Sequence, residues 1–165
     1  MKVLNFGCNL FKLNGFTNID IDLANKPDEL MDLRELRLNY SDNSVDFVHA
    51  GHFFEHIGWE DGKKLMQDVH AVLKPYSSIV ITIPDYTKAT ATETIEDAER
   101  IILNYGNHVA LYNIKRLEEL AKQAGFRLYT ELDLERVPWI LLPAAPVGTI
   151  PLPEKWQTSF LAMKT

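Results

Sequence analysis

The fold is decided by the segment VDFVHAGHFFEHIGWEDGKKLMQDVHAVLKPYSSIVITIP, residues 45–84. It opens with the apolar run Val45–Ala50 and closes with the β-branched run Ser78–Ile83, so two buried strands are predicted. Between them, residues Trp59–Leu73 place apolar side chains on one face at helical spacing, and Lys74-Pro75 ends the helix. Because neighbouring parallel strands need such a crossover, the segment predicts a strand–helix–strand unit of a parallel sheet.

Shorter apolar runs extend the sheet on both sides of this unit. Runs at Lys2–Phe6, Thr17–Ile21 and Leu30–Leu33 predict three strands before it. Runs at Phe126–Val137 and Gln157–Met163 follow it with no helical pattern between them, which predicts an antiparallel hairpin. The 165 residues are therefore expected to form one α/β domain, residues 1–165, with a doubly wound, mainly parallel seven-stranded sheet that ends in an antiparallel C-terminal hairpin.

Two further helices and a proline-rich insert are predicted in the second half of the chain. Thr90 and Glu93 have capping-box spacing, so the first of these helices is expected to begin there. Asn113 can cap the second helix, and Gly125 can end it. Three interpretations of the insert Val137–Pro153 stay open: a lid over a substrate pocket, a contact with a second subunit, as in a homodimer, or a loop packed on the end of the sheet.

Composition excludes several classes of partner. Lys and Arg total 17 against 23 Asp and Glu, a net charge of -6, which argues against broad binding to nucleic acid or to an anionic membrane. The single cysteine, Cys8, cannot form an intramolecular disulfide and fits a reducing compartment. No signal peptide and no apolar run of membrane-spanning length are present, so a cytoplasmic protein is expected.

The ends of the first strands carry residues suited to a nucleoside. Gly7 ends the first strand and lets backbone N–H groups approach a ligand, and Asp20 near the end of the second can accept hydrogen bonds from a ribose diol. Asp22 is an alternative to Asp20, although it can also cap the next turn. Asp32 could accept from an adenine amino group while Leu33 packs on the ring, and the alternative is an ordinary turn acid. Gly7 and Asp20 together indicate a nucleoside ligand.

The segment 49–56 after the fourth strand is rich in histidine. His49, His52, Glu55 and His56 suggest a metal, but their spacing matches neither the His-Glu-x-x-His pattern nor a Cys/His pattern, so no metal site is predicted. The preferred interpretation is that Gly51 and His52 pass close to the ligand. The walls of its pocket are then expected to include Phe53, Phe54 and His56, with Tyr86 and Tyr112 as further wall residues.

Six segments, in order and in register, resemble class I S-adenosylmethionine-dependent methyltransferases, and most closely the short, type-11-like group. The resemblance covers about residues 1–126, and His108, Tyr112 and Gly125-Phe126 also resemble the closing segment of that group. The six segments are Val3–Asn9, Gly15–Asp22, Ser41–Val48, Phe54–His56, Val72–Pro75 and Ile83–Asp85.

This resemblance implies a Rossmann-like fold and the transfer of a methyl group from S-adenosyl-L-methionine by direct displacement. The acceptor is expected to be a small molecule or a sugar-like compound. Because a hydroxyl or ring-nitrogen acceptor must lose a proton, the candidate catalytic bases are His56, Asp85 and His108, with a structural role as the alternative for His56. The residues expected to bind the cofactor are Phe6, Gly7, Cys8, Asn9, Asp20, Ile21, Asp32, Leu33, Gly51 and His52.

Two departures from the family pattern favour a second hypothesis. Asn9 stands where the family has a second glycine, although asparagine tolerates left-handed backbone angles. The link Asn9–Thr17 leaves little room for the usual crossover helix. The alternative is therefore a degenerate, non-catalytic methyltransferase-fold protein that acts through protein contacts. A nicotinamide-binding domain fits poorly, because that fingerprint needs three glycines and a more distant acid.

Overall fold

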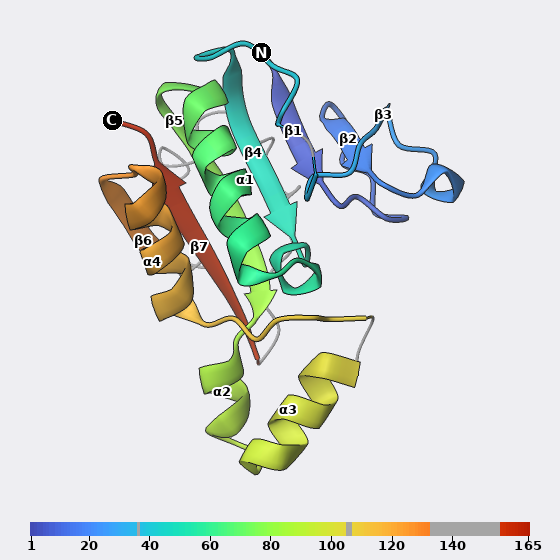
Figure 1. Ribbon diagram of the computed structural model, residues 1–165, viewed down its shortest axis with the longest axis vertical. Helices are drawn as coiled ribbons and strands as arrows, with labels where there is room; N and C mark the ends of the chain where they lie inside the picture. Colours follow the sequence, from blue (N-terminus) through green and yellow to red (C-terminus); the bar gives the residue numbers. More distant parts are fainter. Residues whose placement is uncertain (36, 105–106, 133–155) are drawn as a thin grey trace.

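The computed structural model describes residues 1–35, 37–104, 107–132 and 156–165. It contains a seven-stranded sheet in the order β3-β2-β1-β4-β5-β7-β6 (Figure 1). The strands β1 to β5 pair in parallel, whereas β7 is antiparallel to both β5 and β6. This confirms the predicted mainly parallel sheet with an antiparallel C-terminal pair. The strands are β1 Val3–Phe6, β2 Thr17–Asp20, β3 Glu29–Leu30, β4 Val45–Gly51, β5 Leu73–Pro84, β6 Leu128–Leu132 and β7 Gln157–Met163.

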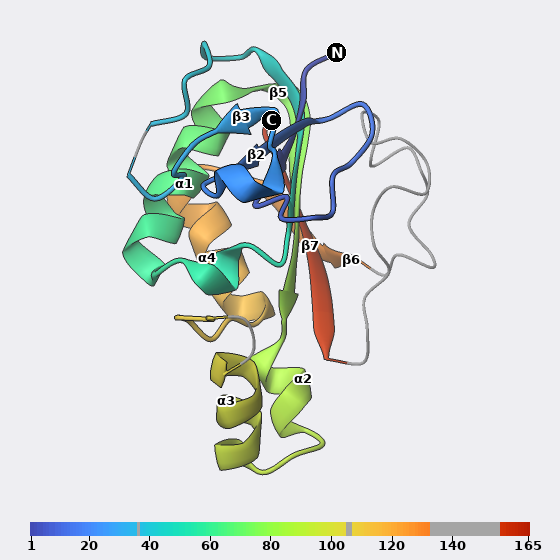
Figure 2. The same cartoon turned by 90° about the vertical axis from the view of Figure 1, so that its right-hand side faces the viewer.

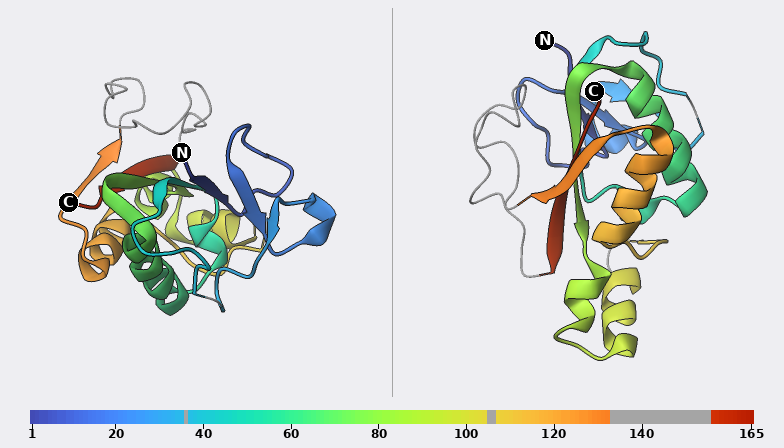
Figure 3. Two further views of the ribbon diagram at one scale, coloured as in Figure 1. Left: turned by 90° about the horizontal axis from the view of Figure 1, so that it is seen from above. Right: turned by 90° about the vertical axis from the view of Figure 1, so that its left-hand side faces the viewer.

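Helices are arranged unequally around the sheet. The helices α1 and α4 cover one face of it, as the edge-on view in Figure 2 shows. The helices α2 and α3 project beyond the end of β5 (Figures 1 and 3). None of the helices in the described residues has the length and apolar character needed to cross a lipid bilayer. The helical elements are η1 Leu23–Asn25, η2 Phe54–His56, α1 Trp59–Val72, α2 Tyr86–Thr90, α3 Ile95–Asn104 and α4 Ile114–Ala124.

Alternation along the strands divides the core between the two faces of the sheet. On β1, Leu4 and Phe6 pack into the large core under α1 and α4, while Val3 joins a smaller cluster on the opposite face. Phe16, from the link between β1 and β2, joins the smaller cluster. The sheet is therefore thickly covered by helices on one face, with a much smaller set of described core residues on the other.

The predicted absence of a first crossover helix is confirmed. No helix lies in the link 7–16, whose residues are all described. Buried amide groups hold this link instead. The Asn18 side chain accepts from the Asn5 amide at 2.9 Å and from the Leu13 backbone N–H at 2.8 Å, and it donates to the carbonyl of Phe16 at 3.2 Å. Side-chain hydrogen bonds thus order a link that contains no helix.

The predicted boundary of the third strand is wrong. The strand β3 covers Glu29–Leu30 rather than Leu30–Leu33. The Asp32 carboxylate accepts from the Arg34 backbone N–H at 3.0 Å, and this local turn takes the chain out of the sheet before Leu33.

The predicted start of the first C-terminal helix is also wrong. Thr94, rather than Thr90, caps α3: its hydroxyl accepts from the Asp97 backbone N–H and donates to the Asp97 carboxylate. Thr90 ends the short helix α2, which was not predicted, and donates to the Tyr86 carbonyl. The cap at Asn113 and the stop at Gly125 are confirmed for α4. The insert Val137–Pro153 and the end of the predicted run Phe126–Val137 lie outside the described residues.

Candidate functional site

The strand order places a switch point between β1 and β4. The chain runs from β1 outward to β3 on one side, and from β4 to β5 on the other. In open α/β sheets, ligands bind outside the carboxyl ends of the strands at such a point. In this protein those ends are Gly7, after β1, and Gly51, which closes β4. The predicted site residues that follow β1, β2 and β4 therefore share one edge of the sheet.

The turn after β1 contains two residues in the left-handed backbone region. Gly7 has a φ of 59° and Asn9 a φ of 45°, both in the left-handed region. The Cys8 backbone N–H donates to the Ile19 carbonyl at 3.1 Å, which ties the turn to β2. Asn9 therefore adopts the left-handed conformation that a glycine would otherwise supply.

Asp20 anchors this turn through its carboxylate. Oδ2 accepts from the Asn9 backbone N–H at 2.7 Å, and Oδ1 accepts from the Asp22 backbone N–H at 2.9 Å. Asp20 is buried, so these two bonds satisfy a carboxylate that would otherwise be costly to bury. A carboxylate has about four lone-pair sites, so each oxygen can still accept a further hydrogen bond. The Asp22 side chain caps η1, the second of the two roles that the sequence allowed for it.

Phe53 covers Gly7 on this edge. A Cβ built on Gly7 would lie 2.5 Å from the Cδ2 atom of Phe53, so only a glycine fits under the ring. The ring packs edge-on against Phe6 and Phe54, with centroid distances of 6.2 and 5.9 Å. A ligand that contacts Gly7 from this side must displace Phe53.

The side chains flanking this turn differ in exposure. Cys8 is buried, and burial raises the pKa of its thiol, with the Asp20 carboxylate acting in the same direction. Phe6 is also buried, within the main core, whereas Ile21 is exposed. The structure therefore leaves Ile21, but not the side chains of Phe6 or Cys8, open to a ligand on the surface.

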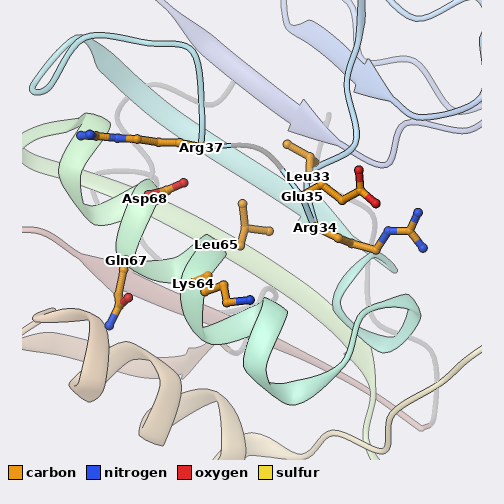
Figure 4. A pocket seen from close by; sticks show the side chains of 8 residues that line it. All are labelled: Leu33, Arg34, Glu35, Arg37, Lys64, Leu65, Gln67 and Asp68. Carbon is orange, nitrogen blue, oxygen red and sulfur yellow. The ribbon is translucent and has the colours of Figure 1, made fainter.

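The predicted adenine-binding residues lie beside a hollow. Arg34 binds the Asp32 carboxylate with two side-chain hydrogen bonds, of 2.9 and 2.7 Å, and this pairing is the largest cause that lowers the Asp32 pKa. Leu33 is buried and lines a hollow of about 250 Å³. Figure 4 shows this hollow between the loop that carries Leu33 and Arg34 and the helix α1 that carries Lys64 and Leu65. The Asp32 carboxylate is therefore already paired with Arg34, and the buried Leu33 forms part of the wall of the hollow.

A polar cluster lies beyond β4. His52, with a φ of 53°, hydrogen bonds through Nδ1 to Oε1 of Glu55 at 2.9 Å. His108 Nε2 lies 3.9 Å from the same oxygen, and the ring centroids of His56 and His108 are 4.6 Å apart. Burial is the largest cause that lowers the pKa of His108, and the Glu55 carboxylate acts in the opposite direction. The structure therefore brings together two of the three predicted bases and His52.

Asp85, the third predicted base, has a structural role in the same region. Its Oδ1 accepts from the backbone N–H groups of Thr87 and Lys88 at 2.8 and 3.2 Å, so it caps α2. Its backbone pairs with Tyr112, whose ring packs against Phe54. Burial raises the pKa of Tyr112 to about 12, so its phenol stays protonated at neutral pH.

Glu55 was not among the predicted site residues. It is 1% exposed and joins two of the histidines, and its backbone carbonyl accepts from the N–H groups of Val109 and Ala110. Its partner His108 lies far along the chain, so local spacing could not reveal the pair. In the sequence, Glu55 stood out only as part of a histidine-rich segment whose spacing matched no metal-binding pattern.

Comparison with known proteins identifies the family. A family model described as a methyltransferase domain matches residues 2–131. No curated protein sequence matches the chain. A SAM-dependent methyltransferase from Archaeoglobus fulgidus is 19% identical with a TM-score of 0.66, over 99% of this chain and 86% of its own. A SAM-dependent methyltransferase from Methanosarcina mazei is 17% identical with a TM-score of 0.60, and the match covers 99% of this chain and 92% of that protein.

A larger enzyme shares the fold as well. Phosphoethanolamine N-methyltransferase 2 of Haemonchus contortus, solved in complex with S-adenosyl-L-methionine, is 18% identical with a TM-score of 0.61. The match covers 99% of this chain but 49% of that enzyme, so this chain spans about half of its length. At these identities the comparisons show a shared Rossmann-like methyltransferase fold.

Proposed function

Because the chain belongs to the methyltransferase domain family, we propose that it binds S-adenosyl-L-methionine at the carboxyl ends of β1 and β2 and methylates a small-molecule or sugar-like acceptor. The observation that carries this proposal is the position of the Gly7 turn beside Asp20, at the strand switch point. When bound, S-adenosyl-L-methionine would supply a methyl group carried on a positively charged sulfur; the acceptor atom would bond to the methyl carbon as the carbon–sulfur bond breaks, leaving S-adenosylhomocysteine.

The residues of the chain fit the cofactor in two respects. The Asp20 carboxylate retains lone pairs that can accept from a ribose diol, and its bond to the Asn9 N–H fixes the turn that would hold the methionine part. Leu33 lines the hollow beside α1, but its side chain is buried and most of the other lining residues are charged or polar, so this hollow adds no support for an adenine site. Phe53 is the obstacle, since it must leave Gly7 for the methionine part to enter.

The proposed role of the histidines is to remove the acceptor proton. Burial holds the pKa of His108 below its ordinary value, so the imidazole is neutral near pH 7, the state that accepts a proton. His56 packs against His108 and is more exposed, which suits it to face an acceptor. Asp85 is the weakest of the three candidates, because one of its oxygens already caps α2.

The test is calorimetric titration of the protein with S-adenosyl-L-methionine, S-adenosylhomocysteine and, as a negative control, NAD⁺. We expect both adenosyl compounds to bind and NAD⁺ not to bind. The Asp20→Asn variant replaces one charged acceptor oxygen by an amide donor and so loses one hydrogen bond worth ~1.5–3 kcal/mol, which should lower the affinity roughly 10–150-fold. Asp22→Asn is the matched control and should bind within about twofold, because Asp22 only caps η1.

The outcome separates the two functions that the sequence left open. Absence of binding by the folded wild-type protein would overturn the proposal. It would favour the non-catalytic alternative, which the position of Phe53 over Gly7 already supports. Thermal unfolding of the Asp20→Asn variant must be measured in parallel, because that variant also loses an acceptor for a backbone N–H in the turn.

A further inference from the structure

The cluster beyond β4 has the donor set of a metal site. Glu55, His56 and His108 each offer one ligand atom, and these three atoms all lie within 4.8 Å of one another. Glu55 and His56 belong to η2, whereas His108 comes from the segment after α3. Residues 49–56 alone match no metal-binding pattern, and the fold adds His108 from a distant segment as the third possible ligand.

Backbone hydrogen bonds hold the two segments together independently of these side chains. The Val109 and Ala110 N–H groups donate to the Glu55 carbonyl at 2.8 and 3.2 Å, and the His56 N–H donates to the Phe53 carbonyl at 3.0 Å. The ligand atoms are therefore carried by backbone that is already positioned, which lowers the entropy lost when a metal binds.

Glu55 supplies an independent observation that indicates a ligand. Its side chain is 1% exposed, and Oε1 pairs with His52 Nδ1. The second oxygen, Oε2, is buried and has no hydrogen-bond partner among the described residues. A buried carboxylate oxygen without a partner is expensive, and such groups occur where an ion or ligand is bound.

We propose that Glu55, His56 and His108 bind a divalent first-row transition metal of the Zn²⁺ type. Two imidazoles and one carboxylate form the three-ligand set of open zinc sites, with a fourth position left for a water or substrate. Magnesium prefers oxygen ligands and is a poor match for two histidines. His52 is a positioning residue, because its bond to Oε1 orients the Glu55 carboxylate.

Metal binding requires only a small rearrangement of side chains. Ligand atoms at about 2.0–2.1 Å from a tetrahedral ion lie roughly 3.3 Å apart, closer than in the structure. His56 is partly exposed and can turn toward the other two ligands. A nitrogen that binds the metal cannot also accept the acceptor proton, so metal binding and the proton removal proposed above exclude each other at His56 and His108.

The test is a Zn²⁺ titration of the tag-free protein after treatment with a chelator, followed by calorimetry. We expect one Zn²⁺ per chain, a visible absorption band when Co²⁺ replaces it, and no measurable binding of Mg²⁺. Glu55→Gln and His56→Gln should each weaken Zn²⁺ binding beyond the ~10–100-fold that outer-shell changes cause, and His52→Gln should fall within that range. His70→Gln is the matched control, because His70 packs against Phe126 away from the cluster.

Two results would overturn the proposal. One is a wild-type protein that does not bind Zn²⁺ or prefers Mg²⁺. The other is a Zn²⁺ affinity that His56→Gln leaves unchanged, and this variant remains decisive if Glu55→Gln fails to fold, because His56 is not fully buried. Neither result depends on methyl transfer, so failure of the metal site and failure of cofactor binding are distinguishable.

Discussion

Replacement of Phe53 by alanine should strengthen the binding of S-adenosylhomocysteine. The ring of Phe53 makes two edge-on contacts, with Phe6 and Phe54, at centroid distances of 6.2 and 5.9 Å. Each such pair stabilises by about 0.5–1.5 kcal/mol, so lifting the ring off Gly7 costs about 1–3 kcal/mol. A ligand that must displace the ring supplies this free energy, which weakens its apparent affinity roughly 5–150-fold. The alanine variant has no ring to displace.

Calorimetric titration of both proteins measures this effect, and urea unfolding checks its origin. The Phe53→Ala variant should bind S-adenosylhomocysteine more tightly, by up to roughly 5–150-fold. Its free energy of unfolding should fall by about 1–3 kcal/mol, because the two ring contacts are lost. Phe11→Ala is the matched control. Phe11 is 82% exposed, so its removal should leave both quantities nearly unchanged.

The sign of the change decides between two roles for the ring. If Phe53 only blocks the site, S-adenosyl-L-methionine and S-adenosylhomocysteine should gain equally. If its face instead attracts the sulfonium, the methyl donor alone should lose about 0.5–2 kcal/mol of binding free energy in the variant. Weaker binding of S-adenosylhomocysteine, whose sulfur is uncharged, by Phe53→Ala would refute the reasoning, because it would show that the ring contacts the ligand rather than excluding it.

Two further predictions concern stability. Burial lowers the pKa of His49 to about 4, below its value in the unfolded chain. Because the unfolded chain binds the proton more tightly, protonation favours unfolding. The free energy of unfolding should therefore fall by up to about 3 kcal/mol as the pH is lowered from 6.5 to 4. His49→Gln should lose correspondingly less in urea titrations across that range, and an equal loss would contradict the assignment to His49. Asn113→Ala removes the acceptor of the Arg116 N–H at the start of α4 and should cost about 0.5–2 kcal/mol in the same assay. The exposed Gln123→Ala on that helix is its control, and equal effects of the two changes would show that the cap contributes nothing.

Much of the fold could be predicted from the sequence, because its elements follow periodic patterns. The runs that became β4, α1 and β5 alternate between buried strand and one-sided helix, and each is long enough for periodicity to be diagnostic. The wrong boundaries lie where a single side-chain hydrogen bond determines which of several nearby residues ends a strand or begins a helix. Asp32 ends β3 early, and Thr94 rather than Thr90 caps α3.

The candidate site was only partly predictable, because its contacts are long-range. Residues at the strand ends could be named, since the topology places them at one edge. The contact between His108 and Glu55 depends on the path of the chain after α3, which no local pattern determines. The same holds for the ring of Phe53 over Gly7, because these two residues follow different strands, β4 and β1.

The missing crossover helix and the bonding of Asp20 are two parts of one arrangement. The resemblance to class I methyltransferases implies a crossover helix after the glycine turn. Here the link 7–16 has no helix, and the Asp20 carboxylate holds the turn by accepting the Asn9 N–H. The residue proposed to bind ribose therefore also positions the backbone that approaches the cofactor. Since the same carboxylate accepts from Asp22, substitution of Asp20 should disturb the turn and the ligand together, whereas substitution of Asp22 should disturb neither.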